Sequence, residues 1–148
     1  MLKPTKILVP TDFSEYSDKA LRQALDIAKQ YQAKVIVLHV VHEHITQCVY
    51  DYCLSAAEVD RAEAQLMGAA RQNLDKQLAK FPQALEIELT SDVKKGLPAE
   101  EILAEEKEKG IDLIVIASLG QTGLSKYLIG GIARNVLKGA KCPVLLTK

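Results

Sequence analysis

The sequence predicts an α/β protein built on an open, parallel sheet of five strands. Five short apolar runs, most of them rich in β-branched residues, are separated by stretches in which apolar residues recur with helical spacing. A regular alternation of strand and helix favours right-handed crossovers and therefore a parallel sheet. The chain of 148 residues, 48% of them hydrophobic, has the size and composition expected of a single domain spanning residues 1–148.

The predicted strands differ in how apolar they are. In chain order they are Lys6–Pro10, Val35–Val41, Leu85–Leu89, Leu113–Ala117 and Val144–Leu146. The first, second and fourth are apolar at successive residues, as expected of central strands that are buried on both faces. In the third, Glu86 and Glu88 alternate with apolar residues. We therefore expect one face of this strand to meet water and the strand to lie at an edge of the sheet.

Helices are predicted in the four gaps between the strands. Their apolar faces lie within residues 20–31, 59–78, 98–109 and 128–140. Ser14 is a suitable N-cap for the first helix. Pro98 has the position of a first-turn proline in the third helix, and Gly110 is expected to end it.

The overall charge and the cysteine count limit the classes of partner. Nineteen basic residues balance nineteen acidic ones, so no global field draws the chain to nucleic acid or to an anionic membrane. No apolar run is long enough to span a bilayer, and residues 2–6 do not resemble a secretory signal. Three cysteines, an odd number, favour reduced thiols. We therefore expect a cytoplasmic protein with no nucleic-acid or membrane partner.

Two segments have the position and composition of a ligand site. Ligands of open parallel sheets bind at the carboxyl ends of strands, where the strand order reverses. Pro10–Ser14 follows the first strand, Ala117–Gly123 follows the fourth, and Gly130 and Gly131 come shortly afterwards. Glycines permit close backbone approach, N–H groups at a helix start bind phosphate, and Asp12 could accept hydrogen bonds from sugar hydroxyls or a base amine. Equally, the glycines could be plain turn residues and Asp12 a turn or cap residue.

Several motifs, in their order along the chain, resemble the universal stress protein family. They are Val9–Ser14, Gly96–Ile102, Asp112–Ile116, Gly120–Ser125, Leu128–Ala133 and Cys142–Leu146. The resemblance implies the strand order 3-2-1-4-5 with helices on both faces, as in the adenine nucleotide alpha hydrolase-like fold. It also implies a role in the stress response and, in one branch of the family, binding of ATP or AMP.

The ATP-binding branch carries the motif Gly-x2-Gly-x9-Gly-Ser/Thr, which this chain matches in part. The corresponding positions are Ala117, Gly120, Gly130 and Gly131, so only the second and third agree. Ala117 adds a methyl group, and Gly131 removes a hydroxyl that holds phosphate in the family. Neither the P-loop motif nor the dinucleotide fingerprint is present.

The resemblance nevertheless implies a complete set of nucleotide contacts. The nucleoside would lie near Asp12 and Val40, with the phosphates over Gly120, Gly130 and the N–H groups of Gly131 and Ile132. Mg²⁺ is expected only as the ion that accompanies ATP. The expected nucleotide-binding residues are Pro10, Thr11, Asp12, Val40, Ala117, Ser118, Gly120, Gly123, Gly130, Gly131 and Ile132.

A homodimer is expected through the last strand. Val144, Leu145 and Leu146 are all apolar, and an apolar edge strand invites pairing with another chain. The family resemblance also implies antiparallel contact between the last strands of two copies. Two functions stay open: a regulatory or sensor protein that binds a nucleotide, and a dimeric stress-protection module that has lost nucleotide binding.

The remaining polar residues point to no catalytic or metal centre. His42, His44, Cys48 and Cys53 could bind a soft metal, but their spacing fits no standard structural zinc motif, so we expect no metal there. No nucleophile elbow is present, and Asp12 is the one obvious carboxylate near the expected site. We therefore expect no catalytic residues and no enzyme, while leaving slow ATP hydrolysis open.

Overall fold

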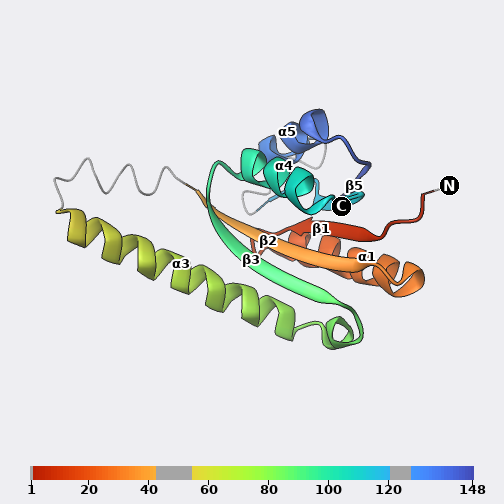
Figure 1. Ribbon diagram of the computed structural model, residues 1–148, viewed down its shortest axis with the longest axis horizontal. Coiled ribbons are helices and arrows are strands. Elements are labelled where there is room, and N and C mark those ends of the chain that lie inside the picture. The colour runs from red at the N-terminus through yellow and green to blue at the C-terminus, as the bar shows by residue number, and fades with distance from the viewer. Residues whose placement is uncertain (1, 43–54, 121–127) are drawn as a thin grey trace.

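The computed structural model describes residues 2–42, 55–120 and 128–148 and shows a five-stranded parallel sheet (Figure 1). The strand order is β3-β2-β1-β4-β5, and all four pairings are parallel. The strands are β1 (Lys6–Pro10), β2 (Lys34–His42), β3 (Leu89–Gly96), β4 (Leu113–Ala117) and β5 (Val144–Thr147). The helices are α1 (Glu15–Tyr31), α3 (Ala56–Ala79), the 3-10 helix η1 (Pro82–Glu86), α4 (Pro98–Lys109) and α5 (Gly131–Gly139). The predicted fold class and strand order are confirmed.

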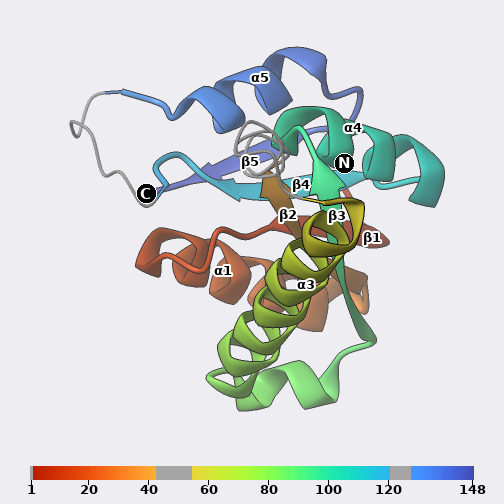
Figure 2. The same ribbon diagram turned by 90° about the vertical axis from the view of Figure 1, so that its left-hand side faces the viewer.

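Helices cover both faces of the sheet because successive residues of the central strands point in opposite directions. Ile7 and Val9 of β1 lie in a core cluster with α1 and with Leu74 of α3. Leu8, between them, lies in a second cluster with residues of α4 and α5, such as Ile102. Figure 2 shows the same division, with α4 and α5 on one side of the sheet and α1 and α3 on the other.

Local signals set the ends of the helices as predicted. The Ser14 side chain accepts a hydrogen bond from the Ser17 N–H at the start of α1. Pro98 occupies the first turn of α4, and Gly110 ends this helix in the left-handed conformation with φ of 64°. At the start of α3, Ser55 and Glu58 form a capping box. None of the helices in the described ranges has the length and apolarity required to cross a bilayer.

The predicted bounds of the third strand are wrong, although its place at the edge of the sheet is confirmed. Residues 82–86 form η1, since Pro82 fixes a helical φ at its first position, and Leu85 is 93% exposed. The strand starts at Leu89, which pairs with Val35. The strand's sequence, LTSDVKKG, is mostly polar because an edge strand needs little apolar surface. The apolar alternation on which the prediction relied occurs instead in the residues just before the strand.

Two leucines that precede β3, Leu74 of α3 and Leu85 of η1, provide a test of the fold. Leu74 of α3 is fully buried, so Leu74→Ala should lower the free energy of unfolding by about 2–5 kcal/mol. Leu85→Ala removes the same atoms from an exposed position and should change it by less than about 0.5 kcal/mol. Urea unfolding followed by circular dichroism would measure both values. Equal losses in the two variants would contradict the placement of α3 and η1.

Candidate functional site

A cavity of about 280 Å³ opens at the carboxyl ends of β1 and β4. β1 pairs with β2 on one side and with β4 on the other, so this is the point where the strand order reverses. Ten of the residues expected to bind the nucleotide line this cavity: Pro10, Thr11, Asp12, Val40, Ala117, Ser118, Gly120, Gly130, Gly131 and Ile132. Gly123 lies outside the described residues.

One wall of the cavity is the turn that joins β1 to α1, residues 11–14. The Asp12 carboxylate accepts hydrogen bonds from the N–H (3.0 Å) and the hydroxyl of Ser14. The Thr11 hydroxyl oxygen accepts a bond from the Phe13 N–H at 3.1 Å. Phe13 has φ of 65°, the left-handed region that non-glycine residues rarely adopt. The turn is thus an uncommon backbone shape held by its own short side chains.

His39 of β2 also lines the cavity and supports this turn. Its ring stacks on Phe13 with 4.2 Å between centroids. Its Nδ1 lies 2.7 Å from the Thr11 carbonyl oxygen, which can only accept, so Nδ1 carries the hydrogen. Burial lowers the pKa of His39, although the hydrogen bond to Thr11 and the charge of Asp12 act in the opposite direction. His39 was not predicted from the sequence. A single polar residue inside an otherwise apolar strand was the signal that could have indicated it.

The backbone of Val40 faces the cavity because β2 extends beyond the end of β1. In a parallel ladder, alternate residues direct their N–H and C=O groups to opposite neighbours. Lys34 donates to Thr5 and Leu38 accepts from Thr11, so the even-numbered residues of β2 face β1. β1 ends at Pro10, opposite Leu38, and therefore offers no strand partner to Val40.

The opposite wall consists of the glycines that follow β4 and precede α5. The Gly130 N–H donates to the Ser118 carbonyl at 2.7 Å, which brings the start of α5 against the end of β4. A Cβ atom on Gly120 would lie 2.8 Å from the Asp12 Oδ2 atom, so this glycine allows the two walls to meet. A Cβ atom on Gly131 would meet nothing within 4 Å.

Among the described residues that line the cavity, the attraction for an anion comes from backbone groups. Asp12 is the one carboxylate among the described residues that line it, and none of these residues is Lys or Arg. The α5 helix starts at Gly131, and in the described part of the chain no side chain caps its first turn. Its N–H groups and the positive end of its dipole are therefore the main attraction for a phosphate.

Of the other residues considered in the sequence, those that the structure describes, His42 and Cys142, do not line this cavity. Among residues 2–42, 55–120 and 128–148, no three His, Cys, Asp or Glu side chains are grouped to hold a metal ion. His42 ends β2, while His44, Cys48 and Cys53 lie outside the described residues. Cys142 packs against the second core cluster, and burial, with the nearby Glu106 carboxylate, raises its pKa to about 12. Its thiol is therefore unreactive at neutral pH.

Comparisons with known proteins find relatives that match nearly the whole chain. Residues 4–148 match the family model described as the universal stress protein family. Universal stress protein MJ0531 of Methanocaldococcus jannaschii is 33% identical over 144 residues, which cover 97% of this chain and 81% of that protein. The solved structure of protein MJ0577 from the same organism has a TM-score of 0.84 at 28% identity and covers 99% of this chain and 97% of its own. A universal stress protein solved in complex with cAMP shares the fold, with a TM-score of 0.66 at 20% identity and coverage of 99% and 98%.

His39 should make the stability of the protein depend on pH. Its pKa in the folded state lies below the ordinary value of 6.5, so on acidification the unfolded chain binds the proton first. The stability that the neutral ring contributes is complete above about pH 6.5 and is lost as the pH falls toward the folded-state pKa. Urea unfolding at several pH values, with an NMR titration of His39, would measure this. In His39→Asn, whose amide keeps a donor near Thr11, the loss should be smaller; the same loss in both proteins would contradict the assignment.

Proposed function

This chain belongs to the universal stress protein family, and we propose that it is a cytoplasmic regulatory or sensor protein of the stress response that binds an adenine nucleotide, ATP or AMP. The observation that carries the proposal is the cavity at the ends of β1 and β4. It combines a carboxylate, an open strand backbone and the start of a helix within one space. Each of these suits a different part of a nucleotide.

The nucleoside would lie on the β1 and β2 side of the cavity. The N–H and C=O groups of Val40 face the space beyond the end of β1, where they could pair with a base edge. Asp12 could accept a hydrogen bond from a ribose hydroxyl or a base amine. The apolar lining residues Ile102 and Ile116 would contact the flat faces of the base.

The phosphates would lie at the start of α5. The N–H groups of Gly131 and Ile132 are in the first turn of this helix and border the cavity. Since no Lys or Arg is among the described lining residues, backbone donors would supply most of the contacts. Mg²⁺ would accompany ATP through its phosphates, with Asp12 as the one carboxylate among the described lining residues.

The second candidate function is a dimeric stress-protection module without a ligand. Ala117 and Gly131, the two departures from the ATP-binding motif, favour it. Mass spectrometry of the denatured, freshly purified protein would detect a nucleotide that had been carried through purification. Titration calorimetry with ATP and AMP would then measure affinity. Saturable binding would support the nucleotide-binding function, whereas no saturation at millimolar ligand would leave the ligand-free module.

Substitutions at two glycines should change affinity for ATP in opposite directions. Gly131→Ser fits open space and restores a hydroxyl near the phosphates, so binding should tighten by about 0.5–1.5 kcal/mol. Gly120→Ala places a methyl group 2.8 Å from the Asp12 carboxylate, which must move, so binding should weaken. Titration calorimetry would measure both, with Gly68→Ala, in open space on α3, as the control. If Gly120→Ala and Gly131→Ser both bind ATP like the parent, the nucleotide lies elsewhere.

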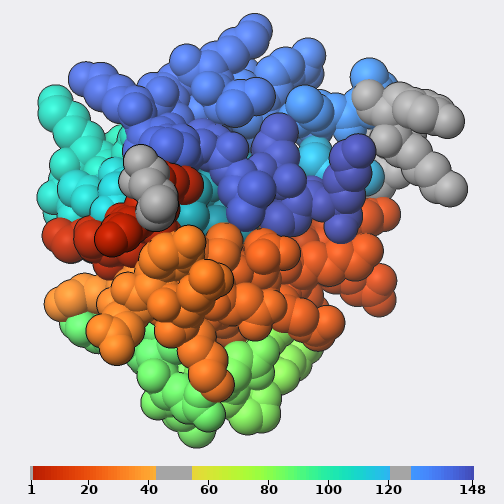
Figure 3. Space-filling model, turned by 90° about the vertical axis from the view of Figure 1, so that its right-hand side faces the viewer, coloured from red at the N-terminus to blue at the C-terminus, as the bar shows by residue number. Residues whose placement is uncertain are grey.

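We further propose that the protein forms a homodimer through β5. This strand lies at the edge of the sheet with Leu145 37% exposed, and an open edge can pair with another strand. On α5, Ile132 and Leu137 are each 45% exposed. Figure 3 shows the C-terminal residues, in blue, forming a continuous area of the surface above the orange residues of α1. An apolar edge beside exposed apolar helix residues suits a second copy of the chain.

Leu145→Lys should dissociate this dimer, because it places a charge on the exposed face of the edge strand β5. Light scattering at micromolar concentration should give the mass of two chains for the parent and of one chain for the variant. Leu85→Lys is the matched control, since Leu85 is 93% exposed and lies in η1. A monomeric parent, or a Leu145→Lys variant that remains dimeric, would refute this interface.

A further inference from the structure

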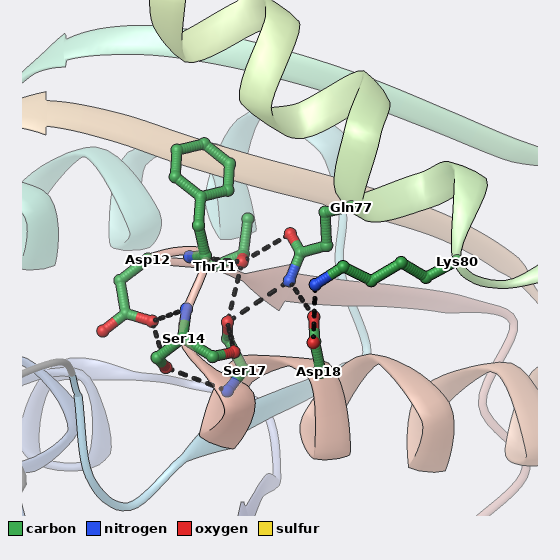
Figure 4. Close-up of polar contacts among 8 residues, drawn as sticks. Thr11, Asp12, Ser14, Ser17, Asp18, Gln77 and Lys80 are labelled. Carbon is green, nitrogen blue, oxygen red and sulfur yellow. Dashed lines mark hydrogen bonds and ion pairs between the residues drawn. The ribbon is translucent and has the colours of Figure 1, made fainter.

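Gln77 of α3 is a polar side chain that is only 2% exposed, and it contacts the turn beneath the cavity. Its Oε1 lies 2.7 Å from the Thr11 hydroxyl oxygen. Its Nε2 lies 2.7 Å from Asp18 Oδ1 and 3.3 Å from Ser17 Oγ. Figure 4 shows Gln77 reaching from α3 to these residues, with Asp12 on the opposite side of the turn. A buried amide whose oxygen and nitrogen both have partners has a defined orientation.

The partners of Gln77 determine which way its hydrogen bonds run. Asp18 is a carboxylate that also accepts from Lys80 at 3.1 Å, so it takes a hydrogen from Gln77. The amide nitrogen must therefore face Asp18, and the amide oxygen must face Thr11. An amide oxygen only accepts, so the Thr11 hydroxyl donates its single hydrogen to Gln77.

The direction of the Thr11–Gln77 hydrogen bond also affects the bonds within the turn. With its hydrogen directed to Gln77, the Thr11 oxygen presents its lone pairs, one of which accepts the Phe13 N–H. Ser17 lies 3.0 Å from the same oxygen and is the competing acceptor for its hydrogen, since Ser17 donates its own to the Ser14 carbonyl. Gln77 thus decides which way the Thr11 hydroxyl points, and the Thr11 hydroxyl holds Phe13 in its left-handed conformation.

We propose that Gln77 is a positioning residue for the turn at residues 11–14 and, through that turn, for the Asp12 carboxylate at the cavity. Its effect on affinity rests on the proposed nucleotide binding; its effect on the turn does not. Because Gln77 belongs to α3, the correct turn requires α3 to be docked. A ligand that prefers the correct turn therefore strengthens the docking of α3 by the same factor, as thermodynamic linkage requires.

The test compares two identical substitutions on α3. Gln77→Met keeps the length of the side chain and removes its hydrogen bonds to Thr11, Ser17 and Asp18. Gln72→Met changes an exposed glutamine of the same helix and is the control. In the protein without nucleotide, hydrogen exchange followed by NMR should show the Phe13 amide exchanging about tenfold faster in Gln77→Met, the loss of about one hydrogen bond. The amides of buried β1 residues should keep the parent rate in both variants.

Nucleotide binding provides the second measurement. Gln77→Met should weaken ATP binding by about tenfold, with the affinity of Gln72→Met unchanged. ATP should also slow exchange in the last turns of α3 in the parent and should no longer do so in Gln77→Met. Unchanged Phe13 exchange in Gln77→Met would overturn the positioning role. If the parent binds no nucleotide but Phe13 exchange rises, the proposed nucleotide binding fails and the positioning of the turn stands.

A paired substitution covers the case in which Gln77→Met does not fold. Gln77→Glu places two carboxylates together at Asp18, so Phe13 exchange should rise well above the parent rate. Adding Asp18→Asn restores a pair of one amide and one carboxylate, with their positions exchanged. The amide at residue 18 then donates to the carboxylate at residue 77, and this carboxylate still accepts from Thr11. The double variant should recover most of the parent protection at Phe13. A double variant no better protected than Gln77→Glu alone would show that the direction of the bonds does not matter.

Discussion

The early end of the central strand is the constraint on which the site depends. β1 stops at Pro10, opposite Leu38, while β2 continues to His42. Beyond that point the backbone of Val40 faces the space that β1 has left, and the chain must leave the sheet through the turn at residues 11–14. The cavity, its open strand backbone and the turn that forms its wall therefore have one origin. A longer β1 would fill the space and remove all three.

The sequence predicted the parts of the fold that depend on apolar burial. The strands and helices that form the two core clusters have continuous apolar runs or stripes, and a wrong assignment of them would expose much apolar surface. β3 has no such apolar run because its outer face meets water. The apolar alternation in residues 85–89 was therefore mistaken for the third strand. The residues around the cavity could be predicted because glycines and an aspartate followed the strands whose ends meet there.

The roles of His39 and Gln77 could not be predicted, because they arise from contacts between distant segments. Gln77 is 66 residues from Thr11 along the chain, and the other residues of its helix face include apolar ones such as Leu74. Nothing in its local pattern separates a buried, fully bonded glutamine from an exposed one. Buried polar groups of this kind specify one arrangement of the backbone because any alternative leaves a donor or acceptor without a partner.

The open space beside Gly131 bears on how the site can evolve. Its Cβ position has no neighbour within 4 Å, so several small side chains fit there without any other residue having to change. A single codon change from glycine to serine would alter the contacts offered to a phosphate while leaving the cores untouched. One substitution at this position can therefore change the lining of the cavity independently of the mutations that govern folding.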